Sequence, residues 1–102
     1  MESQIDQKRE QIAELCRRHR VRRLALFGSA AREDFDPERS DLDFVVEFEP
    51  LPPGTYARTY FDLLEALQQL FGRRVDLVEA GSVRNPYIRQ EIETWQETLY
   101  AA

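Results

Sequence analysis

Residues 21–48 read VRRLALFGSAAREDFDPERSDLDFVVEF, and two predicted strands in this stretch decide the fold. The first strand, residues 21–27, ends in a dense apolar run before the Gly28-Ser29 turn. In the second strand, residues 41–48, successive side chains alternate between two faces. The face predicted to join the core carries Leu42, Phe44, Val46 and Phe48. The opposite face carries Asp41, Asp43, Val45 and Glu47.

Helical patterns flank these strands. A first helix is predicted from an N-cap at Ser3 to about His19, and residues 30–33 can begin a short helix. Residues 56–71 place apolar side chains at helical spacing and are followed by Gly72, a favourable C-cap. Downstream, residues 75–79 predict a third strand.

The last predicted helix opens at Asn85-Pro86, because proline is well tolerated in a first turn. Its apolar stripe consists of Ile88, Ile92, Trp95 and Leu99. The order of elements predicts an α/β (α+β) fold with a small, three-stranded mixed sheet flanked by helices. At 102 residues the chain fits a single domain, residues 1–102.

Composition narrows the functional classes. Hydrophobic residues make up 42% of the chain, enough for a core, and the single Cys16 excludes an intramolecular disulfide. No apolar run approaches the roughly 18 residues that cross a bilayer. The net charge of −5 argues against stable nucleic-acid binding. The polar, charged N-terminal region is unlike a signal or transit peptide, so we expect a cytoplasmic protein with no membrane association.

The acidic residues predict a metal site. Eight of the nineteen acids lie between positions 33 and 49. Asp41 and Asp43 are two residues apart on one strand, so both carboxylates leave the same face about 7 Å apart. Hard divalent cations such as Mg²⁺ prefer carboxylate oxygens together with substrate phosphates. The alternative is an edge strand that shows polar side chains to water.

Two further features add to this interpretation. Gly28 and Ser29 follow a strand and precede a helix start, where backbone N–H groups and a hydroxyl can meet a phosphate; an ordinary turn is the alternative. Asp76 is an isolated acid in an apolar strand, which is costly to bury unpaired. If its strand pairs beside residues 41–48, Asp76 completes a three-carboxylate site. Otherwise it faces solvent or pairs with Arg73 or Arg74.

These residues carry a family resemblance. GSAAREDFDPERSDLDFVVEF, with the later VDLV, resembles the minimal nucleotidyltransferase (MNT) domains of the DNA polymerase beta superfamily. Their signature is Gly-Ser, a spacer, Asp-x-Asp and a third Asp on a following strand. The resemblance covers most of the chain and implies Mg²⁺-dependent transfer of a nucleoside monophosphate from a nucleoside triphosphate to a hydroxyl.

The resemblance also implies roles for single residues. Gly28 and Ser29 would hold the triphosphate, Asp41 and Asp43 would bind the metals, and Asp76 would bind the catalytic metal beside the attacking hydroxyl. Arg32 fits the Ala-Arg that follows Gly-Ser in the family and would neutralise phosphate charge or anchor the loop through a nearby acid.

The chain departs from the family pattern in two places. Eleven residues separate Ser29 from Asp41, one more than in many members, and Glu33 stands where a glycine often follows Arg32. Negative charge at Glu33 would weaken nucleotide binding unless the side chain points outward or caps a helix.

Stand-alone MNT proteins of this length resemble the antitoxins of HEPN–MNT toxin–antitoxin pairs. The resemblance implies that AMP passes from ATP to a tyrosine hydroxyl of the partner HEPN ribonuclease toxin, and the short chain leaves acceptor recognition to that partner. One alternative is a non-catalytic module that neutralises its partner by occlusion. Another is nucleotidyl transfer to a small molecule or an RNA end.

Overall fold

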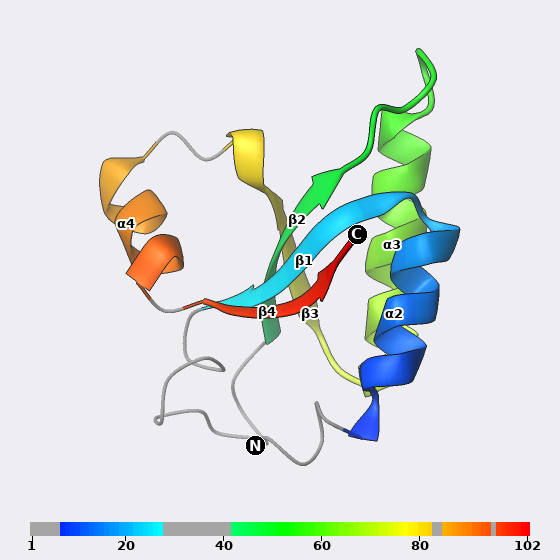
Figure 1. The fold of residues 1–102 in the computed structure, drawn as a ribbon, viewed down its shortest axis with the longest axis horizontal. Helices are drawn as coiled ribbons and strands as arrows, with labels where there is room; N and C mark the ends of the chain where they lie inside the picture. Colours follow the sequence, from blue (N-terminus) through cyan, green and yellow to red (C-terminus); the bar gives the residue numbers. More distant parts are fainter. Residues whose placement is uncertain (1–6, 28–41, 83–84, 95) are drawn as a thin grey trace.

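The computed structural model describes residues 7–27, 42–82, 85–94 and 96–102. Helices α2 and α3 lie side by side on one side of a sheet, and α4 lies on the other side (Figure 1). The elements in chain order are α2 (Arg9–Arg18), β1 (Val21–Phe27), β2 (Leu42–Phe48), α3 (Tyr56–Phe71), β3 (Val75–Glu79), η2 (Ala80–Ser82), α4 (Pro86–Thr94) and β4 (Glu97–Ala101). Among the described residues, no helix is both long enough and apolar enough to span a bilayer.

The sheet is mixed and has the strand order β3-β2-β1-β4. Strand β1 runs antiparallel to both β2 and β4, whereas β2 and β3 are parallel. Parallel neighbours need a long crossover, and α3 supplies it between β2 and β3. This arrangement confirms the predicted mixed sheet with flanking helices.

The predicted number of strands is wrong, because the chain adds a fourth. The last helix ends at Thr94, and Leu99, which was assigned to its apolar stripe, lies in β4 and is buried in the core. An apolar residue at this position satisfies a helical or a strand period equally well. Thr98 and Tyr100 favour a strand, and pairing with β1 gives their backbone groups partners. Trp95 lies outside the described residues.

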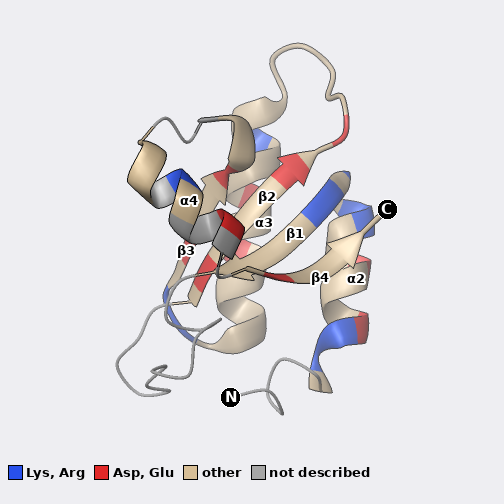
Figure 2. Ribbon diagram, turned by 60° about the vertical axis from the view of Figure 1, so that its left-hand side comes forward, with Lys and Arg blue, Asp and Glu red and all other residues tan. Residues whose placement is uncertain are grey.

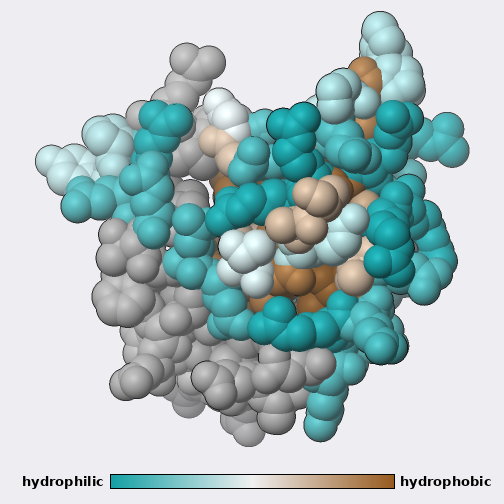
Figure 3. All heavy atoms as spheres, viewed as in Figure 1, coloured by the Kyte–Doolittle hydropathy of each residue, from teal (hydrophilic) through white to brown (hydrophobic). Residues whose placement is uncertain are grey.

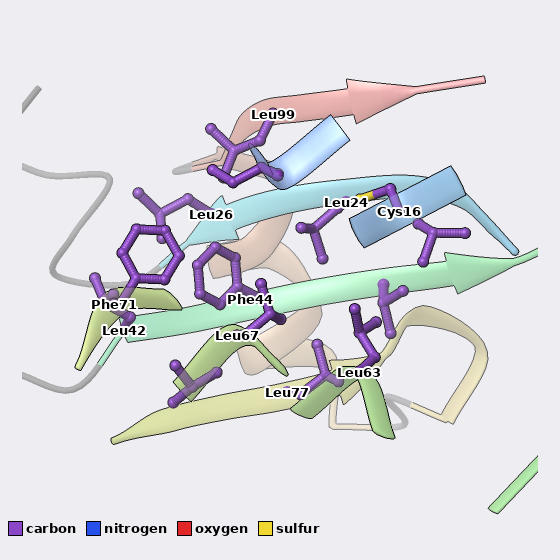
Figure 4. Close-up of a cluster of buried hydrophobic side chains, with 14 residues drawn as sticks. Cys16, Leu24, Leu26, Leu42, Phe44, Leu63, Leu67, Phe71, Leu77 and Leu99 are labelled. Atoms are coloured by element: carbon purple, nitrogen blue, oxygen red, sulfur yellow. The ribbon is translucent and has the colours of Figure 1, made fainter. Parts of the chain in front are cut away.

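The main core fills the space between the sheet and helices α2 and α3 (Figure 4). Three of the four side chains predicted to face the core on β2 are fully buried there, and Phe48 is half-buried against them. Those three are Leu42, Phe44 and Val46. Phe44 also packs against Phe71 of α3, with ring centroids 5.8 Å apart.

Strand β4 is tied to this layer through α2. An ion pair of 2.8 Å joins Arg9 of α2 to Glu97 of β4. Half-buried Leu15 and Tyr100 from the same two elements pack against the main core. In Figure 3, hydrophobic residues gather in the centre of the visible face, over β4 and α2, and hydrophilic residues surround them.

Local signals explain where the helices end. Gly72 closes α3 in a left-handed conformation with φ of 65°, and its N–H donates to the carbonyl of Gln68. After α2, Arg20 adopts φ of 58° in the turn into β1. The predicted start of the first helix at Ser3 and the short helix at residues 30–33 lie outside the described residues.

Candidate functional site

Asp43 of β2 and Asp76 of β3 are register partners in the parallel pair of strands. Their chain neighbours Phe44 and Leu77 are buried in the main core, so both carboxylates leave the opposite face of the sheet. Adjacent strands lie about 4.8 Å apart, which brings the two carboxyl groups close together. Asp76 is exposed and Asp43 is half-buried. Figure 2 colours the acidic positions of both strands red.

The two acids lie at the end of the sheet where β1 finishes. Phe27, the last residue of β1, is the register partner of Asp43, and Leu42, the first residue of β2, pairs with Val75. The segment that joins these strands carries the other predicted site residues. Those residues, Gly28, Ser29, Arg32 and Asp41, lie outside the described residues.

The carboxylates fit the donor chemistry of a hard cation. Mg²⁺ is usually held by one or two carboxylates together with substrate phosphates, and Asp43 and Asp76 offer two such groups on one accessible face. Within the described residues, no group of three or more His, Cys, Asp or Glu side chains gathers as a metal site. Asp41, the third predicted carboxylate, lies outside that part of the chain.

The alternatives for Asp76 can be tested against its surroundings. Within the described part of the chain, no ion pair joins Asp76 to Arg73 or Arg74. Its exposure agrees with a solvent-facing position, but its placement beside Asp43 goes beyond that alternative.

Tyr60, one of the side chains at helical spacing in the predicted helix 56–71, contacts the strand that carries Asp76. The Tyr60 hydroxyl of α3 donates a hydrogen bond to the backbone carbonyl of Leu77. Burial, and secondarily the negative charge of Asp76, raise the pKa of the Tyr60 phenol above its ordinary value. The helical spacing that identified Tyr60 contained no signal for this contact, because it depends on how α3 crosses β3.

An open groove lies along the edge strand β3, next to α3. It has a volume of about 480 Å³ and lies between the first turns of α3 and strand β3. Aromatic rings line its helix side: Tyr56 packs against Tyr60 at 6.3 Å between centroids, and Tyr60 against Phe61 at 5.1 Å. We call it the α3–β3 groove, and its lining residues are Tyr56, Ala57, Tyr60, Phe61, Leu77, Val78 and Glu79.

Known sequences similar to this chain point to one family. A model of the nucleotidyltransferase domain matches residues 8–94. A candidate protein adenylyltransferase of Methanocaldococcus jannaschii is 42% identical over 79 residues, which are 78% of this chain and 76% of that protein. The protein adenylyltransferase MntA of Thermococcus cleftensis is 39% identical over 72 residues, 71% of this chain and 69% of that protein.

Solved structures of nucleotidyltransferases have a similar fold. A candidate minimal nucleotidyltransferase superposes with a TM-score of 0.73 and 35% identity, over 90% of this chain and 89% of that one. The structure of a tri-AMPylated HEPN toxin from Shewanella oneidensis in complex with MNT antitoxin contains a similar chain. The match has a TM-score of 0.66 and 20% identity, and it covers 96% of this chain and 73% of that one.

Proposed function

Because this chain belongs to the nucleotidyltransferase domain family, we propose that it transfers AMP from ATP to a tyrosine hydroxyl of a HEPN ribonuclease toxin and so acts as its antitoxin. The observation that carries the proposal is the pairing of Asp43 with Asp76 on an accessible face of the sheet. Relatives named as protein adenylyltransferases, and a neighbouring fold found with an AMPylated HEPN toxin, support the choice of reaction and acceptor.

The proposed reaction is an in-line displacement at the α-phosphorus of ATP. The acceptor oxygen forms a bond to this phosphorus while the bond to pyrophosphate breaks, and the hydroxyl gives up its proton to solvent or to the departing pyrophosphate. Asp41, Asp43 and Asp76 would hold Mg²⁺, which when bound neutralises the triphosphate and polarises the reacting oxygens. Gly28, Ser29 and Arg32 would bind the triphosphate.

The carboxylates contribute by position and charge. The rigid β2–β3 pair fixes Asp43 and Asp76 relative to each other before substrate arrives, so little reorganisation is needed during the reaction. No side-chain nucleophile is required, because the acceptor hydroxyl attacks directly. We further propose that residues 1–102 act as one MNT domain in the cytoplasm, where ATP is available.

Radioactive labelling of a purified pair tests this proposal. The wild-type chain, incubated with ATP, Mg²⁺ and its cognate HEPN toxin, should attach AMP to the toxin. Asp43→Asn and Asp76→Asn should each lower the labelling rate by about 100-fold or more and keep the wild-type circular dichroism spectrum. Glu47→Gln is the matched control, because Glu47 lies on β2 far from Asp76 and pairs with Arg23 at 3.5 Å. No labelling by the wild-type pair rejects the proposal.

The same variants separate catalysis from occlusion. If Asp43→Asn still neutralises the toxin in cells at wild-type abundance, neutralisation needs binding alone and the enzymatic antitoxin is wrong. Labelling of small molecules in the absence of any toxin would instead identify a different acceptor.

A further inference from the structure

The α3–β3 groove is an exposed aromatic surface without an assigned role. The exposed fractions of Phe61 and Tyr56 are 62% and 45%. Among the described residues only one other large hydrophobic side chain is exposed, Tyr87 on α4. Clustered exposed aromatic side chains are typical of protein-binding surfaces, whereas scattered ones need no explanation.

The backbone at the edge of β3 is already engaged by α3. The carbonyl of Leu77 accepts a hydrogen bond from the Tyr60 hydroxyl, and the N–H of Val75 donates to the side-chain oxygen of Gln68 at 3.4 Å. An edge strand with occupied backbone groups is a poor template for an added strand. A partner in this groove would therefore bind through side chains.

The groove and Asp76 share strand β3. Leu77 and Val78 of its floor follow Asp76 in the same strand, and the charge of Asp76 contributes to the raised pKa of Tyr60. To reach Asp43 and Asp76 on the other face of the sheet, residues that flank a segment in the groove would pass around the edge of β3, which is the outermost strand. An acceptor hydroxyl must reach this position.

The charges around the groove indicate which kind of peptide segment it would bind. Glu79 lies in the lining, where its carboxylate accepts the N–H of Gly81. On α3, Asp62 adjoins Phe61 and faces the mostly exposed Arg58 at 3.9 Å. Arg58 and Asp62 offset each other, so the one charged residue among the described lining residues is the acid Glu79, which complements a basic segment. Arginine or lysine can also stack on exposed aromatic rings.

We propose that the α3–β3 groove docks the segment of the HEPN toxin that flanks its modified tyrosine, a short segment with an apolar anchor and an adjacent Lys or Arg. The inference rests on the proposed function and adds how the acceptor is recognised. The groove would give this domain a surface that binds the acceptor protein.

Photo-crosslinking tests the docking site independently of catalysis. The photoreactive amino acid p-benzoylphenylalanine replaces Phe61 in one chain and Tyr87 in a control chain, and each is irradiated with the cognate HEPN toxin. We expect the position-61 probe to crosslink to a basic, apolar peptide that contains or adjoins the modified tyrosine, and the position-87 probe to give at least tenfold less product. Equal yields from both probes, no product at position 61, or a peptide remote from that tyrosine would overturn the proposal.

Kinetics provide a second measurement. Phe61→Ala should raise the KM for the toxin roughly tenfold or more, as expected for an aromatic anchor, while Tyr87→Ala should leave it unchanged. An unchanged KM in Phe61→Ala contradicts docking in the groove. If the wild-type pair shows no AMP transfer, the proposed function fails, whereas the crosslinking result still decides the docking site.

Discussion

The two faces of the sheet differ in what they bury. The face under α2 and α3 carries the main core, where Phe44, Leu63 and Leu67 are fully buried. On the other face the only buried cluster among the described residues is Ala25 with Val45, and Asp43 and Asp76 share this face. Alternation along the same strands separates the two roles: one set of side chains stabilises the fold, and the next set is available for chemistry.

The largest expected effect on activity is that of a substitution at Asp76, which we compare with its neighbour Leu77 on the opposite face of β3. Asp76→Asn should lower the rate of AMP transfer by about 10²–10³-fold or more, because charge stabilisation at the phosphates is lost. Its free energy of unfolding should stay within about 0.5 kcal/mol of wild type. Labelling kinetics and urea denaturation measure the two effects.

Leu77→Ala should have the opposite effect, a loss of stability rather than of catalysis. It should lower the free energy of unfolding by about 2–5 kcal/mol through lost burial and a cavity. At temperatures where the variant is folded, its turnover number at saturating toxin should stay close to that of wild type, although Leu77 also lines the α3–β3 groove. If Asp76→Asn destabilises the protein as much as Leu77→Ala, the separation of roles between the faces is wrong.

Alkaline pH should weaken the helix-covered face. Burial raises the pKa of the Cys16 thiol to about 12. The unfolded thiol ionises near pH 9, whereas the folded thiol keeps its proton, so the free energy of unfolding falls as pH rises from about 9 to 12. The loss attributable to this group reaches about 4 kcal/mol. Cys16→Ala lacks this contribution, so denaturation at several pH values should give a shallower decline; parallel declines in both proteins would contradict the buried thiol.

Val45 and Val46 allow the two faces of the sheet to be compared with the same substitution, valine to alanine. Both are buried neighbours in β2, but Val46 belongs to the main core and Val45 to the small cluster on the other face. Each change to Ala removes about 1.6 kcal/mol of transfer free energy. Val46→Ala should cost up to about 1 kcal/mol more, because the dense core closes less readily around a cavity. Urea denaturation of the two variants measures the difference, and an equal or larger loss in Val45→Ala would show that both faces are packed alike.

The smallest effect is expected on the solvent side of α2. Arg18 and Glu14 form an exposed ion pair of 3.1 Å within the helix. Glu14→Gln should change the free energy of unfolding by no more than about 0.5 kcal/mol, and the change should shrink in 1 M salt. A salt-independent loss above 1 kcal/mol would indicate a role beyond this pair.

Local patterns were sufficient for most of the fold. The predicted bounds of β1, α3 and β3 are confirmed, because turn residues such as Gly72 lie next to long periodic runs. The predicted core-facing set of β2 is confirmed as well. Leu99 was misassigned because its spacing fits two periods, and the choice between them depends on β1, which lies more than 70 residues away in the sequence.

The site depended more on non-local pairing. Alternation along each strand predicts which face Asp43 and Asp76 occupy, but it brings them together only if the two strands pair in register. The structure shows that they do. The α3–β3 groove was not predicted, because it is created by the packing of a helix against an edge strand. The roles of Gly28, Ser29, Arg32 and Asp41 stay predictions.

The position of β4 has a consequence for synthesis of the protein on the ribosome. Strand β1 ends at Phe27, whereas its second partner begins at Glu97. At roughly 5–20 residues per second, the ribosome needs about 4–14 s to travel between them. During that interval one side of the strand is open and the nascent chain is vulnerable to sticking to other chains. Production of this protein should therefore depend on chaperones more strongly than its small size suggests.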